Sequence, residues 1–261
     1  MTVTPAHQDS PPRAIRRLTP EQEAAGPAVL CFPHAGGSAS FFRPWRTLPG
    51  TPRLHAVQYP GREDRFAEDP PATLPDLART LAAEILAGPE RYPVFFGHSM
   101  GAYVAFEVAH LLEQAGAPVT TLVVSSAAAP ASRPPVPFEH SADVLAYLEG
   151  YEPVTPEIRE DEELLELVLD CLKGDLRLVA HYREHAGKQV TSRLVAVVGE
   201  DDVPGIRDGV PQWQQHTRGE FVLLTRPGGH FYLRTDPPVP LLAREAAQHA
   251  AAPRTSRWDA G

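Results

Sequence analysis

The stretch VFFGHSMGAYVAFEVAHLL, residues 94–112, is the part of this sequence that most clearly indicates a fold. An apolar run ends in Gly97-His98-Ser99-Met100-Gly101, and an amphipathic run follows directly. This is the G-x-S-x-G pattern in its meaningful context, with a strand before the serine and a helix after it. The turn is so sharp that the positions two before and two after Ser99 must be glycine, because side chains there would collide with neighbouring chain. We therefore predict that Ser99 is a nucleophile at the N-terminus of a helix, where amides and the helix dipole favour developing negative charge.

Short apolar runs on both sides of this turn predict further buried strands. They are rich in Val, Leu and Phe and apolar on both faces, as strands in the middle of a parallel sheet are. Amphipathic patterns between them predict helices, among them 74–85 and 104–115. This alternation predicts an α/β fold with a mostly parallel open sheet and helices on both faces. The predicted strands are residues 27–32, 53–59, 92–97, 121–126, 193–199 and 220–225.

The alternation is interrupted at residues 127–190, which contain no convincing strand pattern. A proline-rich stretch there leads into helical patterns, and we predict that residues 130–190 form a helical lid insertion over the strand ends. An ordinary helical extension of the core is the alternative. The insertion divides the core into residues 25–129 and 191–252. Residues 1–24 and 253–261 are predicted to be flexible tails.

Composition limits the classes of function. The net charge of −9 argues against a nucleic-acid binder, which would carry a basic field. The two cysteines, Cys31 and Cys171, are too few for a disulfide framework, which indicates a reducing compartment. Both lie in apolar segments and are interpreted as buried thiols. The N-terminus lacks the apolar core of a signal peptide, and no apolar run approaches the length of a membrane span. We expect a soluble, cytoplasmic protein that does not bind a membrane.

A nucleophilic serine needs a base, and the base needs a third group to orient it. In this architecture the chain order is serine, acid, histidine. His230, in the glycine-flanked loop RPGGHFYL after the last predicted strand, is the predicted base. Three rivals are set aside: His98 is expected to point away from the serine, and His216 and His249 are interpreted as surface residues of helices.

The acid is predicted to follow the strand at 193–199. That strand ends in Gly199-Glu200-Asp201-Asp202, and either aspartate could orient the imidazole. Asp202 is the predicted residue because it lies further past the strand end. Asp201 is the next candidate and Asp208 a remote third, and a solvated acidic turn is the structural alternative.

Acyl transfer also needs two N–H donors for the oxyanion. One is predicted to be the backbone amide of Met100, the residue after the nucleophile. The other is expected from the loop after the first core strand, Pro33-His34-Ala35-Gly36-Gly37, with Ala35 N–H as the candidate. The glycines could instead serve only a tight turn.

A competing motif lies at 181–185, where His-Tyr-Arg-Glu-His matches the H-x-x-E-H zinc pattern. A zinc site needs a further carboxylate and supporting hydrogen bonds, and nothing in the sequence marks them. A solvated helix face is the favoured interpretation. We expect no metal and no bound cofactor.

Several blocks together resemble type II thioesterases, the free-standing α/β-hydrolase partners of polyketide synthases and nonribosomal peptide synthetases. The blocks are CFPHAGGSASFFRPW, VQYPGREDRF, FFGHSMGAYVAFEVAHLLEQAG, VVGEDD and PGGHFYL, in family order between about Pro27 and Leu233. The resemblance implies an α/β-hydrolase fold, a triad of Ser99, Asp202 and His230, and an oxyanion hole at Ala35 and Met100. LKGDLRLVAHY resembles the family's lid helix, whereas YLEGYEPVTPEI departs from its usual glycine-centred turn.

The resemblance also implies a function and a partner. The substrate would be an acyl or peptidyl thioester on the phosphopantetheine arm of a carrier protein, and the protein would be a monomer that clears misprimed or stalled carriers. A broad carboxylester hydrolase would share the same catalytic residues. A release domain excised from a synthase is disfavoured by the N-terminal methionine and tail. A non-catalytic binding module would be expected to lack a triad member, and none is missing.

Carrier domains are usually acidic, so attraction to this acidic chain requires basic groups near the mouth of the site. Arg43 and Arg46 follow the oxyanion loop, and Arg62 and Arg65 follow the second strand. We predict that these arginines contact the carrier. The alternative is that they pair locally with Glu63 and Asp64.

Overall fold

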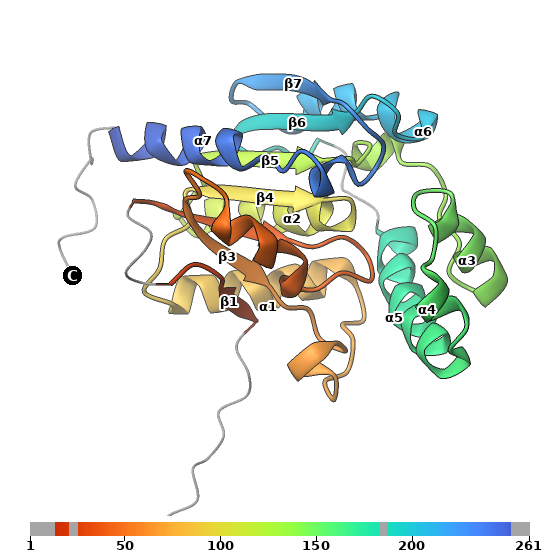
Figure 1. Cartoon of the computed structure of the whole chain (residues 1–261). Coiled ribbons are helices and arrows are strands. Elements are labelled where there is room, and N and C mark those ends of the chain that lie inside the picture. Colours follow the sequence, from red (N-terminus) through yellow and green to blue (C-terminus); the bar gives the residue numbers. More distant parts are fainter. Residues whose placement is uncertain (1–13, 21–25, 183–186, 252–261) are drawn as a thin grey trace, which may run out of the picture.

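The predicted sheet is present and mostly parallel. The computed structural model describes residues 14–20, 26–182 and 187–251. Its strands lie in the order β1-β3-β2-β4-β5-β6-β7, and each neighbouring pair from β3 to β7 is parallel (Figure 1). The strands are β1 (Ile15–Arg17), β2 (Ala28–Phe32), β3 (Arg53–Val57), β4 (Val94–His98), β5 (Thr121–Ser125), β6 (Arg193–Gly199) and β7 (Phe221–Arg226).

Helices cover both faces of this sheet because the inner strands are apolar at consecutive positions. Leu30 and Phe95 pack toward α1 and α2, whereas their neighbours Cys31 and Phe96 pack toward η1 and α7. The predicted α/β architecture is confirmed. The elements are α1 (Leu74–Ala87), α2 (Met100–Gln114) and α7 (Val239–Ala251), with the shorter α6 (Pro204–Arg207), η1 (Ala39–Thr47), η2 (Glu63–Arg65), η4 (Val210–His216) and η5 (Tyr232–Arg234).

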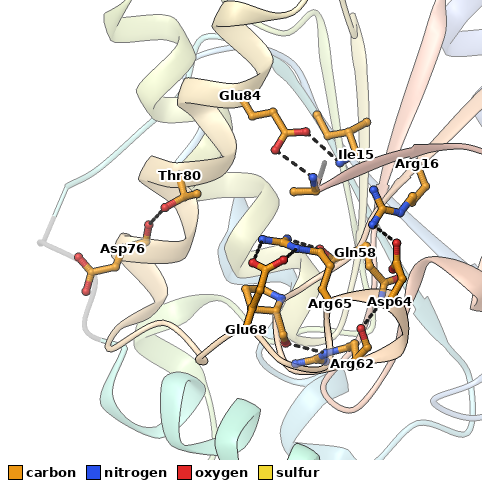
Figure 2. A network of polar contacts seen from close by, with 12 residues as sticks. Ile15, Arg16, Gln58, Arg62, Asp64, Arg65, Glu68, Asp76, Thr80 and Glu84 are labelled. Carbon is orange, nitrogen blue, oxygen red and sulfur yellow. Dashed lines mark hydrogen bonds and ion pairs between the residues drawn. The ribbon is translucent and has the colours of Figure 1, made fainter. Parts of the chain in front are cut away.

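The prediction of a tail over residues 1–24 is wrong for β1. Ile15–Arg17 pair antiparallel with β3, and Glu84 of α1 accepts the backbone N–H groups of Ala14 (3.0 Å) and Ile15 (3.1 Å) (Figure 2). Three residues with two arginines carry no apolar pattern, so this strand depends on partners distant in sequence. It forms the antiparallel edge strand of the sheet.

Between β5 and β6 the chain leaves the sheet and forms three helices, α3 (Ser141–Glu149), α4 (Pro156–Arg159) and α5 (Glu162–His181), after the short η3 (Pro130–Ser132). We call α3–α5 the helical insertion. It lies beyond the carboxyl ends of the strands (Figure 1). A small core of its own holds it together, formed by Val144, Leu169, Leu172 and Leu176. None of the helices within the described ranges is long and apolar enough to cross a membrane.

Candidate active site

Ser99 occupies the strained turn that its pattern predicts. It links β4 to α2 with φ 53° and ψ −120°, a backbone conformation that few residues other than glycine adopt. A Cβ on Gly97 would collide with the carbonyl oxygen of Gly101, and a Cβ on Gly101 would collide with that of Phe32. Both flanking glycines are therefore required by close approach of the backbone, which lets the serine stand at the helix N-terminus.

The structure brings Asp202 and His230 together. Nδ1 of His230 lies 3.0 Å from Oδ1 and 3.2 Å from Oδ2 of Asp202, and both residues are buried. Val203 N–H donates to the same Oδ1 at 2.8 Å, which fixes the carboxylate. Asp201 and Asp208, the other two candidates, have exposed side chains. The acid–histidine contact thus involves the aspartate chosen from the sequence.

Ser99 and His230 line one small cavity, together with Ala35 and Met100. An adjoining hollow shares Ser99, Ala35 and His230. All the residues predicted for nucleophile, base and oxyanion donors therefore meet at one place. The cavity is closed mainly by apolar and aromatic side chains, including Tyr103, Val136, Tyr147, Tyr151, Leu176 and Val179.

Two tyrosines of the helical insertion belong to this site although sequence reasoning did not select them. The Tyr151 hydroxyl donates to the Tyr147 hydroxyl at 3.1 Å, and the Tyr151 ring lies 4.3 Å from that of His230. Burial raises the pKa of Tyr151, so this hydroxyl stays protonated. Tyr147 lies on α3 and Tyr151 in the turn after it, and nothing in the sequence indicates that this turn meets His230.

His98 lies beside the site but is held by the core. Its Nδ1 is 3.0 Å from Oγ of Ser125, which in turn is 2.9 Å from the hydroxyl of Tyr232. Burial, and secondarily the neighbouring His230, keeps the pKa of His98 well below its ordinary value. His98 is therefore a neutral, fixed ring.

His216 differs from its interpretation as a surface residue. It is buried at the end of η4, packs against Phe106 and Trp213, and its Nδ1 lies 3.2 Å from Lys188 O. The polar sequence around His216 does not indicate that it is buried, because residues of α2 and of the segment before β6 contribute to covering it.

The competing H-x-x-E-H motif, for which a solvated helix face is the favoured interpretation, lies only partly within the described residues. His181 is exposed on α5, with Nδ1 2.9 Å from Arg177 O and its ring against Phe138. His185 lies outside the described residues. Across the ranges that the structure describes, no group of three His, Cys, Asp or Glu side chains is arranged to hold a metal ion.

The four arginines predicted to face a carrier fall into two kinds. Arg43 and Arg46 are exposed on η1. Arg62 and Arg65 are mostly buried, so the prediction that they contact a carrier is wrong. The local alternative named the wrong partners too, since Arg65 pairs with Glu68 (Figure 2) and Arg62 pairs with Asp175 of α5.

A parallel sheet with a serine in the β4–α2 turn, and an acid and a histidine after later strands, defines the α/β-hydrolase class. Within it, the chain belongs to the thioesterase domain family, which matches residues 27–246.

Curated relatives agree with this family. Thioesterase PikA5 of Streptomyces venezuelae is 38% identical over 239 residues, covering 89% of this chain and 84% of the relative. A probable cadicidin biosynthesis thioesterase of Streptomyces griseus is also 38% identical, covering 86% of this chain and 63% of the relative. The chain thus spans less than two thirds of that second protein.

Solved structures show the same likeness. The type II thioesterase BorB from the borrelidin biosynthetic cluster superposes with a TM-score of 0.75 at 35% identity, covering 89% of this chain and 97% of BorB. YbtT, a type II thioesterase from the yersiniabactin pathway, superposes with a TM-score of 0.81 at 27% identity, covering 92% of this chain and 100% of YbtT. Both neighbours are type II thioesterases, and the pathway of YbtT is a combined nonribosomal peptide and polyketide pathway.

Proposed function

We propose that this chain hydrolyses acyl or peptidyl thioesters on the phosphopantetheine arm of carrier proteins, clearing misprimed or stalled units in polyketide or nonribosomal peptide biosynthesis. One observation carries the proposal: in a thioesterase-family chain, Ser99 shares a cavity with the His230–Asp202 pair. The thioester substrate is inferred from membership of the family, and the nucleophilic mechanism from the residues that line the cavity.

In the proposed reaction Ser99 attacks the thioester carbonyl while His230 accepts its proton. Because Asp202 engages Nδ1, the other ring nitrogen, Nε2, is the base. The amides of Ala35 and Met100 stabilise the oxyanion. The C–S bond then breaks and His230 protonates the departing pantetheine thiolate, which leaves as the thiol, and water activated by His230 cleaves the acyl–Ser99 ester. Every step uses protein groups and water, so no cofactor enters the proposal.

The apolar wall of the cavity suits this substrate. An acyl chain can lie against Met100, Val136 and Leu176, while the pantetheine arm approaches through the adjoining hollow past Leu172 and Phe231. Closing both with the helical insertion would exclude bulk water from the acyl–enzyme, the role proposed for a lid.

The proposed carrier-docking surface is the basic hollow between β1 and η1. Arg16, Arg17, Arg43 and Arg46 line it, with Glu63 and Asp64 as its acidic members. In a chain with a net charge of −9, this local excess of positive charge is where an acidic carrier would be attracted.

The function is tested with carrier proteins loaded with different acyl groups, and release is followed by intact-protein mass spectrometry. Matched oxygen esters distinguish a thioesterase from a broad carboxylester hydrolase, which would cleave both. Unchanged acyl-carriers throughout the panel would contradict the proposal.

Docking is tested by charge reversal at Arg43 and Arg46. The Arg43→Glu and Arg46→Glu variants should raise KM for the acyl-carrier, more strongly at low salt, and leave hydrolysis of acyl-pantetheine unchanged. Arg91→Glu is the matched control, because Arg91 is exposed just before β4 and does not line this hollow. Equal losses on both substrates would contradict docking at this surface.

A further inference from the structure

An ion pair with little exposure ties the helical insertion to the core beside the candidate active site. The guanidinium of Arg62, in the loop after β3, contacts the Asp175 carboxylate of α5 in bidentate fashion, with Nη1–Oδ2 and Nη2–Oδ1 both at 2.7 Å. Their side chains are only 11% and 5% exposed. Bidentate geometry of this kind is both stronger and more directional than a simple charge contact.

The same two side chains also hold the loop that follows Ala35. Asp175 Oδ2 accepts the N–H of Gly36 at 2.7 Å, and Arg62 Nη1 donates to the carbonyl oxygen of Gly37 at 3.0 Å. Two consecutive residues of the loop are therefore held by hydrogen bonds, Gly36 through its N–H group and Gly37 through its carbonyl oxygen.

The beginning of this loop is tied to Arg62 as well. The guanidinium lies over the ring of Tyr59, 5.3 Å from its centroid, and the Tyr59 hydroxyl donates to Pro33 O at 3.2 Å. The segment Pro33–Gly37 is thus held by hydrogen bonds at both ends, and Ala35 lies between them. A segment with two glycines has little rigidity of its own, and Gly36 adopts a positive φ of 74°.

We propose that Asp175 and Arg62 are positioning residues, which hold the Ala35 amide in its donor geometry only while α5 is packed on the core. Ala35 N–H is the oxyanion donor in the proposed function, on which this inference rests. Because Asp175 is on the insertion and Gly36 on the core, displacement of α5 breaks the hydrogen bond that sets this amide. Seating of the insertion and completion of the oxyanion hole are consequently one event.

The test separates this role from a merely structural one. In the double variant Arg62→Met/Asp175→Leu the ion pair is replaced by apolar groups of similar length, which leaves no unpaired charge buried, and thermal unfolding verifies that the variant is folded. We expect kcat on acyl-pantetheine to fall about 10²-fold, as a misplaced catalytic group requires, with KM nearly unchanged. Affinity for an alkyl boronic acid, which forms a tetrahedral adduct with serine, should fall in parallel.

Two further variants complete the design. Asp175→Asn keeps an oxygen that can accept Gly36 N–H, so its loss of kcat should be smaller than that of the double variant. Asp170→Asn is the matched control, an exposed aspartate on the same helix that pairs with Lys173, and it should behave as wild type.

A double variant that is stably folded and retains wild-type kcat and boronate affinity would overturn the inference alone. A wild-type protein that hydrolyses no thioester would contradict the proposed function, and this inference with it.

Discussion

Replacing Asp202 by asparagine tests the candidate triad through a single proton. Asparagine has the shape of aspartate, so its carbonyl oxygen can keep the 2.8 Å bond from Val203 N–H. Its amide group then faces Nδ1 of His230, which the carboxylate contacts at 3.0 and 3.2 Å. An amide NH₂ requires Nδ1 to be an acceptor, which moves the imidazole proton to Nε2. In that tautomer His230 cannot take the proton of Ser99.

The expected loss is large and specific to kcat. An equivalent tautomer change in a serine triad lowers kcat by about 10⁴-fold, which corresponds to about 5 kcal/mol of transition-state stabilisation. KM should change little, because Asp202 lies behind His230 and not among the cavity-lining residues. The assay is steady-state hydrolysis of acyl-pantetheine, with thermal unfolding to verify the fold. Asp201→Asn, at the exposed neighbour, is the control. Asp202→Asn with more than a tenth of wild-type kcat, or with a smaller loss than Asp201→Asn, would refute the assignment.

Three further predictions concern the packing of Gly101, the titration of His55 and the competing metal motif. Gly101→Ala should lower the free energy of unfolding in urea by about 1–3 kcal/mol, because its Cβ meets Phe32 O; an unchanged midpoint would contradict the packing. Burial lowers the pKa of His55 to about 4, from an ordinary value of about 6.5. Between these two pH values only the unfolded chain binds this proton, so the free energy of unfolding decreases as the pH falls, by up to about 1.4 kcal/mol per pH unit. His55→Phe should flatten that slope, and an identical slope in both proteins would disprove it. EDTA should leave hydrolysis unchanged; a loss that zinc reverses would revive the metal motif.

Much of the fold was predictable because local sequence specifies it. Strands β2 to β6 are apolar at consecutive positions, and each lies within or next to its predicted run. β7 was located for the same reason, although as an edge strand it leaves Leu223 42% exposed. The elbow at Ser99 was predictable because its steric requirement is written in two glycines. Asp202 and His230 followed from chain order in a known architecture.

Features that depend on contacts between distant segments could not be predicted. β1 exists through β3 and Glu84, far along the chain. Arg62 appears in the sequence as a surface charge, and only the fold of α5 brings Asp175 to it. Tyr151 reaches His230 for the same reason. The charge and hydropathy of a residue indicate whether its side chain favours water or the core, but they do not indicate which distant residue it will contact in the fold.

In the proposed function, Ser99 is the nucleophile that cleaves an acyl thioester from a carrier. Wild-type protein and Ser99→Ala are mixed with the same acyl-loaded carrier, and the carrier mass is followed in time by intact-protein mass spectrometry. We expect wild type to return the carrier to its free thiol form, whereas Ser99→Ala, slower by roughly 10⁶-fold as in other serine hydrolases, leaves it acylated. Release by Ser99→Ala at more than a tenth of the wild-type rate would show that Ser99 is not the nucleophile.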